Sequence, residues 1–180
     1  GKISRAHTDH AVVKKVIENI KKNGDKAVQK YTEKFDGIRL EKFKVEKDEI
    51  ENAAKRVPKD LKEAFKKAAK NIEKFHKAQL TQPKIVETTK GVKCWQEYRA
   101  IEKVGLYVPG GTAPLPSTLL MLAIPAKTAG CKEIVVCTPP GKDGKIPDII
   151  LYTAKMTGVT KIFKIGGAQA IVAMAYGTDE

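Results

Sequence analysis

Two segments of the sequence combine glycines with side chains that could hold a ligand. Residues 105–112 have the sequence GLYVPGGT, and residues 165–170 have the sequence IGGAQA. In both, a short apolar run ends in glycines, which let the backbone turn and approach a ligand closely. Tyr107 has a ring that can pack on a ligand and a hydroxyl that can donate, and the amide of Gln169 can donate and accept. Each segment therefore predicts a binding turn, with a buried tyrosine or an ordinary tight turn as the alternative.

Neither segment has a complete phosphate-binding fingerprint. Gly105 and Gly110 have the spacing of a P-loop, but Gly111 stands where that loop has its lysine. The contact with β- and γ-phosphates would be missing, which excludes a nucleoside triphosphatase of this kind. The second segment is not the G-x-G-x-x-G dinucleotide motif, although two glycines before a helix are typical of an anion or nucleotide site. Spacing alone therefore leaves the ligand class open.

The histidines and cysteines predict no catalytic or metal-binding residue. His7 and His10 lie three residues apart, but no third ligand is near them, and His76 lies alone in a helical pattern. Surface or capping roles follow for all three, because a zinc site needs three or four ligands. The three cysteines have no paired spacing, which argues against a disulfide framework and favours a reducing cytoplasm.

The composition is that of a globular chain with a basic first half. The formal net charge is +13 over 180 residues, but the last eighty residues contain only eight Lys and six Asp or Glu. Lysine outnumbers arginine by 30 to 4, whereas nucleic-acid sites favour arginine for bidentate contacts. We therefore expect solvated lysine-rich faces, with a polyanion site as the alternative. No signal segment or membrane span is predicted.

The elements around the two glycine-rich segments predict an α/β fold. Short apolar runs alternate with helical patterns in the second half of the chain. The predicted strands are 103–107, 133–138 and 161–165, and the predicted helices are 117–129, 147–156 and 168–176. This alternation predicts βαβ units and a Rossmann-like parallel sheet, whose strands end at one common edge. Since ligands bind at that edge, Tyr107 and Gln169 should both lie there.

The first hundred residues predict a helix-rich region with a few strands. Helical spacing runs to a stop at Asn23-Gly24, resumes at Asp25, and appears again after Asp48, which is the expected N-cap. A long helix over 59–79 should bury one apolar stripe against the rest of the lobe or a partner subunit. The remaining predictions are a short strand at 43–45 and two extended stretches, 84–88 and 92–99, forming a hairpin or two sheet edges.

Four stretches, which follow one another along the chain in the family's order, resemble the histidinol dehydrogenase family. They are VGLYVPGGTAPLPSTLLMLAIPAKTAGCKEIVVCTPP (104–140), KIGGAQAIVAMAYGT (164–178), NGDKAVQKYTEKFDG (23–37) and NIEKFHKAQ (71–79). The related sulfopropanediol dehydrogenases share the Pro-Gly-Gly core and form an alternative. However, the sequences TAPL at 112–115 and GGAQ at 166–169 are closer to those of the histidinol enzymes.

The resemblance implies an NAD-dependent oxidation of L-histidinol to L-histidine through histidinal, by a zinc-containing homodimer of histidine biosynthesis. It implies that Tyr107 and Gln169 contact NAD. Residues 1–100 would form the opening part of a first large lobe, and 101–180 a βαβ nucleotide-binding lobe. Family members are more than twice as long, and their zinc ligands, proton-transfer Glu-His pair and most substrate contacts have no matching positions here. We therefore expect an amino-terminal part, incomplete relative to the family and inactive alone. The alternative is a non-catalytic, lysine-rich binding module.

Overall fold

The computed structural model describes residues 7–110 and 113–179, and omits the side chains of residues 7–9. Gly111 and Thr112 of the first glycine-rich segment, and the side chain of His7, therefore lie outside the described part. The elements in chain order are α1 (His7–Asp36), α2 (Lys47–Arg56), α3 (Lys59–Lys77), β1 (Val86–Thr89), β2 (Val92–Cys94), β3 (Lys103–Tyr107), α4 (Pro116–Thr128), β4 (Glu133–Thr138), α5 (Asp148–Thr157), β5 (Lys161–Lys164) and α6 (Gly167–Tyr176).

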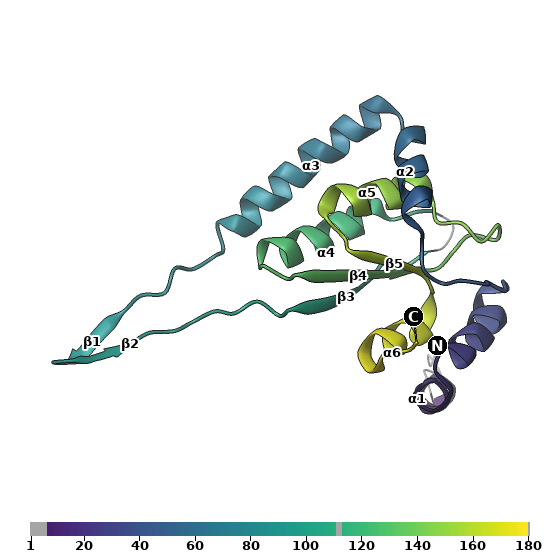
Figure 1. Cartoon of the computed structure of the whole chain (residues 1–180), viewed down its shortest axis with the longest axis horizontal. Coiled ribbons are helices and arrows are strands. Elements are labelled where there is room, and N and C mark those ends of the chain that lie inside the picture. Colours follow the sequence, from purple (N-terminus) through teal and green to yellow (C-terminus); the bar gives the residue numbers. More distant parts are fainter. Residues whose placement is uncertain (1–6, 111–112, 180) are drawn as a thin grey trace, which may run out of the picture.

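The three strands predicted in the second half form one parallel sheet in the order β3-β4-β5, which confirms the α/β fold. Helices α4 and α5 cover one face of the sheet, and α6 with α1 lies on the other (Figure 1). The central residues of the strands are apolar because both faces of the sheet are covered. β5 ends at Lys164, one residue before the predicted end.

The two faces of the sheet belong to two separate hydrophobic clusters. Val136 and Ile162 point into the cluster with α4 and α5, whereas their neighbours Cys137 and Phe163 point into the cluster with α1 and α6. This division follows from the alternation of side chains along a strand. The amino-terminal helices complete both clusters, since α1 packs on α6 and α2 packs on α5.

Helix α1 is interrupted where the sequence predicts a stop. Gly24 has φ 51° and ψ −132°, a non-helical conformation within a continuous run from His7 to Asp36. This left-handed φ suits glycine because it has no Cβ. The element therefore consists of two helical segments joined at a kink, and both segments contribute to the core, through Val16 and Val28 respectively.

Three expectations for the amino-terminal half need correction. Asp48 lies in the first turn of α2, and the N-cap of this helix is Glu46. In the first turn, the Asp48 carboxylate is close to the positive end of the helix dipole. The expected strand at 43–45 makes only an isolated antiparallel bridge, between Lys44 and Phe163. The stripe of α3 is only partly buried within this chain: Leu61, Phe65 and Ile72 are half-buried, whereas Phe75 is 64% exposed. The reason is that α3 lies on the outside of the molecule, where it packs mainly on α4.

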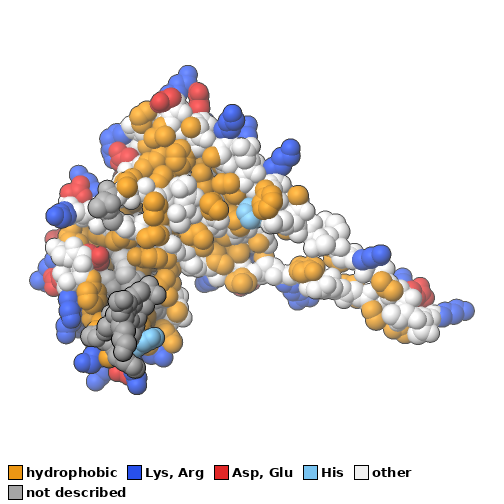
Figure 2. All heavy atoms as spheres, turned by 180° about the vertical axis from the view of Figure 1, so that it is seen from behind, with side chains coloured by type: hydrophobic (Ala, Val, Ile, Leu, Met, Phe, Trp, Pro, Cys, Tyr) orange, Lys and Arg blue, Asp and Glu red, His pale blue; other side chains and the backbone are white. Residues whose placement is uncertain are grey.

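Residues 80–102 form an extended arm that leaves the body of the molecule (Figure 1). Its end is the antiparallel hairpin of β1 and β2, which pair only with each other in the described structure. Trp95, Tyr98 and Ile101 are 58%, 62% and 70% exposed, and apolar side chains run along the arm between the lysines (Figure 2). The predicted hairpin is confirmed, and the arm presents apolar surface. Within the described residues, no helix is both long and apolar enough to cross a membrane.

Candidate functional site

Near the carboxyl end of β3, the helices that follow the strands lie on opposite faces of the sheet. Helix α4 follows β3 on one face, whereas α6 lies on the opposite face and contacts β3 as well as β4 (Figure 1). In open α/β sheets, a crevice forms at the carboxyl ends of the strands where connecting helices diverge to opposite faces, and ligands bind in it. Both glycine-rich segments lie at this edge: the first includes the end of β3 and the turn after it, and the second follows β5.

Tyr107 and the turn before α6 are joined by a hydrogen bond. The backbone N–H of Gly167 donates to Tyr107 Oη at 3.0 Å, across 60 residues of sequence. Tyr107 is the last residue of β3, opposite Cys137 of β4. Since its oxygen already accepts, the hydroxyl proton is left to donate to another group. The structure thus brings together the two segments that the sequence placed at one edge.

Gln169 lies deeper than the sequence pattern suggests. It is fully buried in the first turn of α6, where its Nε2 donates to Asp36 Oδ2 at 3.4 Å. Its Oε1 is also buried and has no hydrogen-bond partner among the described residues. Buried hydrogen-bond acceptors normally have a donor as their partner, so Gln169 Oε1 is a candidate to accept a hydrogen bond from a ligand.

The glycines at this edge are required by close packing. A Cβ on Gly110 would lie 2.4 Å from Pro139 Cγ, and one on Gly166 would lie 2.7 Å from Pro139 Cβ. Gly167 has φ +61°, and a Cβ there would lie 2.6 Å from Gln169 Oε1. Larger residues would therefore displace either the proline or the buried amide.

A cavity of about 420 Å³ opens at the same place. Its lining combines two aromatic rings, a carboxylate and an ammonium group with residues of both glycine turns. The lining residues are Phe35, Asp36, Tyr107, Gly110, Pro139, Pro140, Gly141, Lys142 and Gly167. Burial raises the pKa of the Asp36 carboxyl. The sequence analysis did not single out Asp36, because its proximity to Gln169 depends on the packing of α1 against α6.

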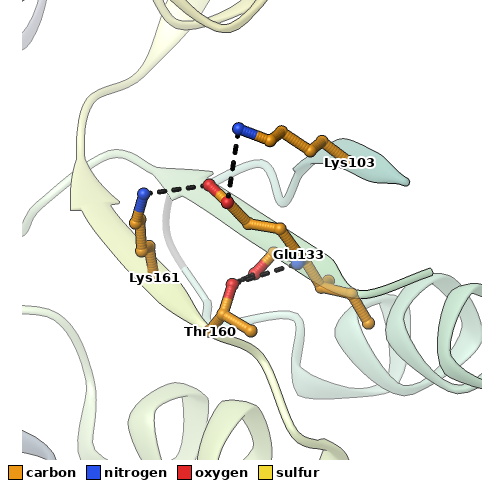
Figure 3. A network of polar contacts seen from close by, with 5 residues as sticks. Lys103, Glu133, Thr160 and Lys161 are labelled. Carbon is orange, nitrogen blue, oxygen red and sulfur yellow. Dashed lines mark hydrogen bonds and ion pairs between the residues drawn. The ribbon is translucent and has the colours of Figure 1, made fainter. Parts of the chain in front are cut away.

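A second group of charges lies at the opposite, amino-terminal edge of the sheet (Figure 3). Glu133 Oε1 accepts from Lys161 Nζ at 2.9 Å, and its Oε2 lies 3.7 Å from Lys103 Nζ. The hydrogen bond from Lys161 is the main cause that lowers the pKa of Glu133. Thr160 Oγ1 accepts from the N–H of Ile134 and donates to its carbonyl. These contacts join the starts of the three strands.

The described residues bring no three His, Cys, Asp or Glu side chains together in a way that could hold a metal ion. His76 Nδ1, near the end of α3, lies 2.8 Å from Oε1 of Gln79, which follows the helix, while His10 lies on α1. No zinc site is therefore assigned within this part of the chain.

Fold and site together define an α/β protein with a doubly covered parallel sheet and a polar crevice at its carboxyl edge. The sequence model of the histidinol dehydrogenase family matches residues 2–180, and the chain belongs to this family.

Relatives in distant organisms share this similarity. The chain is 57% identical to histidinol dehydrogenase of Bacteroides fragilis over 167 residues, covering 93% of this chain and 39% of the relative. It is 54% identical to the chloroplastic histidinol dehydrogenase of Arabidopsis thaliana, covering 94% of this chain and 36% of that protein. The crystal structure of histidinol dehydrogenase from Elizabethkingia anophelis superposes with a TM-score of 0.94 at 50% identity, covering 98% of this chain and 41% of that one. The chain thus spans about two fifths of the length of these relatives.

Proposed function

We propose that the polypeptide containing this chain oxidises L-histidinol to L-histidine in two NAD-dependent steps, through histidinal, as an enzyme of histidine biosynthesis. The observation that supports this most strongly is the family match over residues 2–180, together with the high identity to proteins named histidinol dehydrogenase. The crevice at the carboxyl edge of the sheet supports a cofactor site in this part of the molecule.

Tyr107 and Gln169 are the proposed NAD-binding residues. The local structure fits such a ligand, because Gln169 Oε1 is a buried acceptor without a partner and the glycines at 110 and 167 leave no room for side chains. The Tyr107 hydroxyl retains a proton to donate toward the cavity of about 420 Å³. NAD, when bound, accepts the hydride; these residues would bind and orient it.

The remaining parts of the proposed machinery are not assigned to these residues. The resemblance implies zinc, a homodimer and a cytoplasmic enzyme, but the described side chains do not form a zinc site. As the resemblance of residues 104–140 and 164–178 implies, we expect the family's zinc ligands and proton-transfer pair to lie outside these 180 residues. We infer that the chain by itself does not turn over histidinol, because lost positioning of the reactants alone forfeits about 7–11 kcal/mol of barrier lowering.

The test is NADH formation from histidinol by the natural polypeptide and, separately, by the purified 180-residue chain, both with added zinc. We expect two NADH per histidinol from the natural polypeptide and none from the chain. Absence of NADH formation by the natural polypeptide would contradict the proposed activity. Comparable turnover by the chain would show that its own residues include the catalytic groups.

A further inference from the structure

Asp36, the last residue of α1, places a carboxylate against the amino end of α6. A Cβ built on Gly166, the N-cap of α6, would lie 3.1 and 3.3 Å from the two Asp36 oxygens. The first turn of α6 has neither an acidic residue nor a side-chain cap of its own. Within the described part of the chain, Asp36 forms no ion pair with Lys or Arg. A residue from a distant helix therefore supplies the negative charge at this helix end.

The carboxylate determines which way the Gln169 amide points. An ionised carboxylate can only accept hydrogen bonds, so it selects the NH2 group, and Nε2 lies 3.4 Å from Asp36 Oδ2. The carbonyl oxygen lies on the other side of the amide, directly behind Gly167, which lines the cavity, while Gln169 itself is fully buried and is not a lining residue. That oxygen is buried and has no partner among the described residues.

We propose that Asp36 is a positioning residue of the cofactor site: by holding Nε2 of Gln169, it presents the Gln169 carbonyl oxygen to a hydrogen-bond donor of NAD. This inference rests on the proposed function. NAD offers two kinds of donor, the ribose hydroxyls and the carboxamide NH2.

The same geometry argues against a phosphate at the amino end of α6. Helix N-termini often bind phosphate through free N–H groups and the positive dipole end. Here the Asp36 carboxylate already lies against Gly166, and a like charge beside it would be repelled. The pyrophosphate of NAD is therefore directed away from α6, and a sugar or carboxamide faces this helix.

The experiment measures NAD affinity of the natural polypeptide by calorimetry, comparing wild type with Asp36→Asn. The variant keeps the shape and can still cap the helix, but its amide group can pair with either end of Gln169. We expect the Kd for NAD to rise about tenfold, as for a lost hydrogen bond to a charged group. Asp36→Glu, which keeps the carboxylate, should recover part of this loss. Asp60→Asn, the same change at an exposed position in the first turn of α3, should leave the Kd unchanged.

A double-mutant cycle with Gln169→Leu separates positioning from a direct contact. In the Gln169→Leu background, Asp36→Asn should have no further effect on the Kd. Repeating the comparison with ADP-ribose, which lacks the nicotinamide, identifies the donor: a retained penalty indicates a ribose hydroxyl, and a lost penalty indicates the carboxamide.

The outcomes distinguish the inference from the proposed function. If wild type binds NAD and Asp36→Asn binds it equally well, the positioning role is wrong while the proposed function stands. An Asp36→Asn effect that persists undiminished in the Gln169→Leu background also overturns it. If wild type does not bind NAD, the proposed function fails and the inference fails with it. If Asp36→Asn does not fold, two other measurements provide the test. The first is the Kd of Asp36→Glu for NAD. The second is the protection of the Gln169 side-chain NH2 protons in NMR spectra of wild type and Asp36→Glu. Unprotected NH2 protons in wild type would overturn the inference.

Discussion

The hydroxyl oxygen of Tyr107 accepts a hydrogen bond from the backbone N–H of Gly167 at 3.0 Å. This bond joins the end of β3 to the start of α6, which follows β5, and so it spans the carboxyl edge of the sheet past the intervening strand β4. It also holds the Tyr107 ring beside the cavity that Asp36 and Lys142 line.

Replacing Tyr107 with Phe should lower the free energy of unfolding by about 0.5–1.5 kcal/mol, because the Gly167 N–H loses its acceptor. Under the proposed function, NAD affinity should fall as well, since the ring stays but the donor is lost. Urea unfolding and calorimetric titration with NAD measure the two effects.

Tyr152→Phe is the matched control for this change. The Tyr152 hydroxyl is buried and has no hydrogen-bond partner among the described residues. Removing it should leave stability unchanged or raise it by up to about 1 kcal/mol, because the unpaired group no longer has to be desolvated. Equal destabilisation by both substitutions would contradict a specific role of the Tyr107 hydroxyl.

Gly167→Ala should destabilise the protein by about 2–4 kcal/mol, and more than Gly37→Ala. Both glycines have left-handed φ, +61° and +69°, which costs an L-residue roughly 1–2 kcal/mol. A Cβ at Gly167 would additionally meet Gln169 Oε1 at 2.6 Å, whereas nothing lies within 4 Å of one at Gly37. The difference in stability between the two variants, measured by thermal unfolding, gives the cost of crowding against Gln169. Equal losses of stability would show that the buried Gln169 amide moves aside without cost.

Stability should fall with rising pH in the alkaline range partly because of Cys137. Burial raises the pKa of its thiol from 9.0 to about 12. Above pH 9 the unfolded chain has lost this proton while the folded chain retains it, so the unfolded state binds fewer protons and stability falls. The contribution is up to about 1.4 kcal/mol per pH unit.

The measurement is the free energy of unfolding from pH 8 upward for wild type and Cys137→Ala. Lysines titrate in both proteins, so the difference between the two slopes reports Cys137 alone. Parallel curves would show that the thiol ionises equally in both states. Cys94, which is exposed, should react readily with a thiol reagent in the folded protein, and Cys137 should react only after unfolding.

The 180-residue chain should self-associate through its arm. Trp95 and Tyr98 are 58% and 62% exposed on a two-stranded extension that has no further sheet to pair with in the described structure. Contiguous exposed apolar surface of this kind favours association. Sedimentation at increasing concentration should show dimers or larger species, and the double substitution Trp95→Ser with Tyr98→Ser should reduce them.

Met121→Ser is the control for the arm, since Met121 is 65% exposed on α4, on the body of the molecule. It should leave the association unchanged. A monomeric wild-type chain at all concentrations would contradict the prediction, and an equal effect of Met121→Ser would place the contact on the body instead.

The elements near the candidate site were predictable because their signals are local. β-branched runs such as Ile134–Val136 specify strands, and the stop at Gly24 marks the break in α1. The parallel order follows from the alternation of strands and helices, so the meeting of Tyr107 and the turn before α6 at one edge could be expected from the chain alone. The extent to which α3 is buried could not be predicted, because an amphipathic stripe indicates an apolar face but not whether another element covers it.

The sequence by itself therefore determined the α/β class, the parallel strands, the hairpin and the pair of glycine turns that place Tyr107 and Gln169 at one edge. Only the tertiary structure decided that Gln169 is buried, that its NH2 group faces Asp36, and that its carbonyl oxygen is the unpaired group. Asp36 and Gln169 are 133 residues apart, and they meet because α1 packs on α6. Contacts of that kind leave no spacing in the sequence, since the hydrophobic effect that brings two helices together is non-directional and is satisfied by many partners.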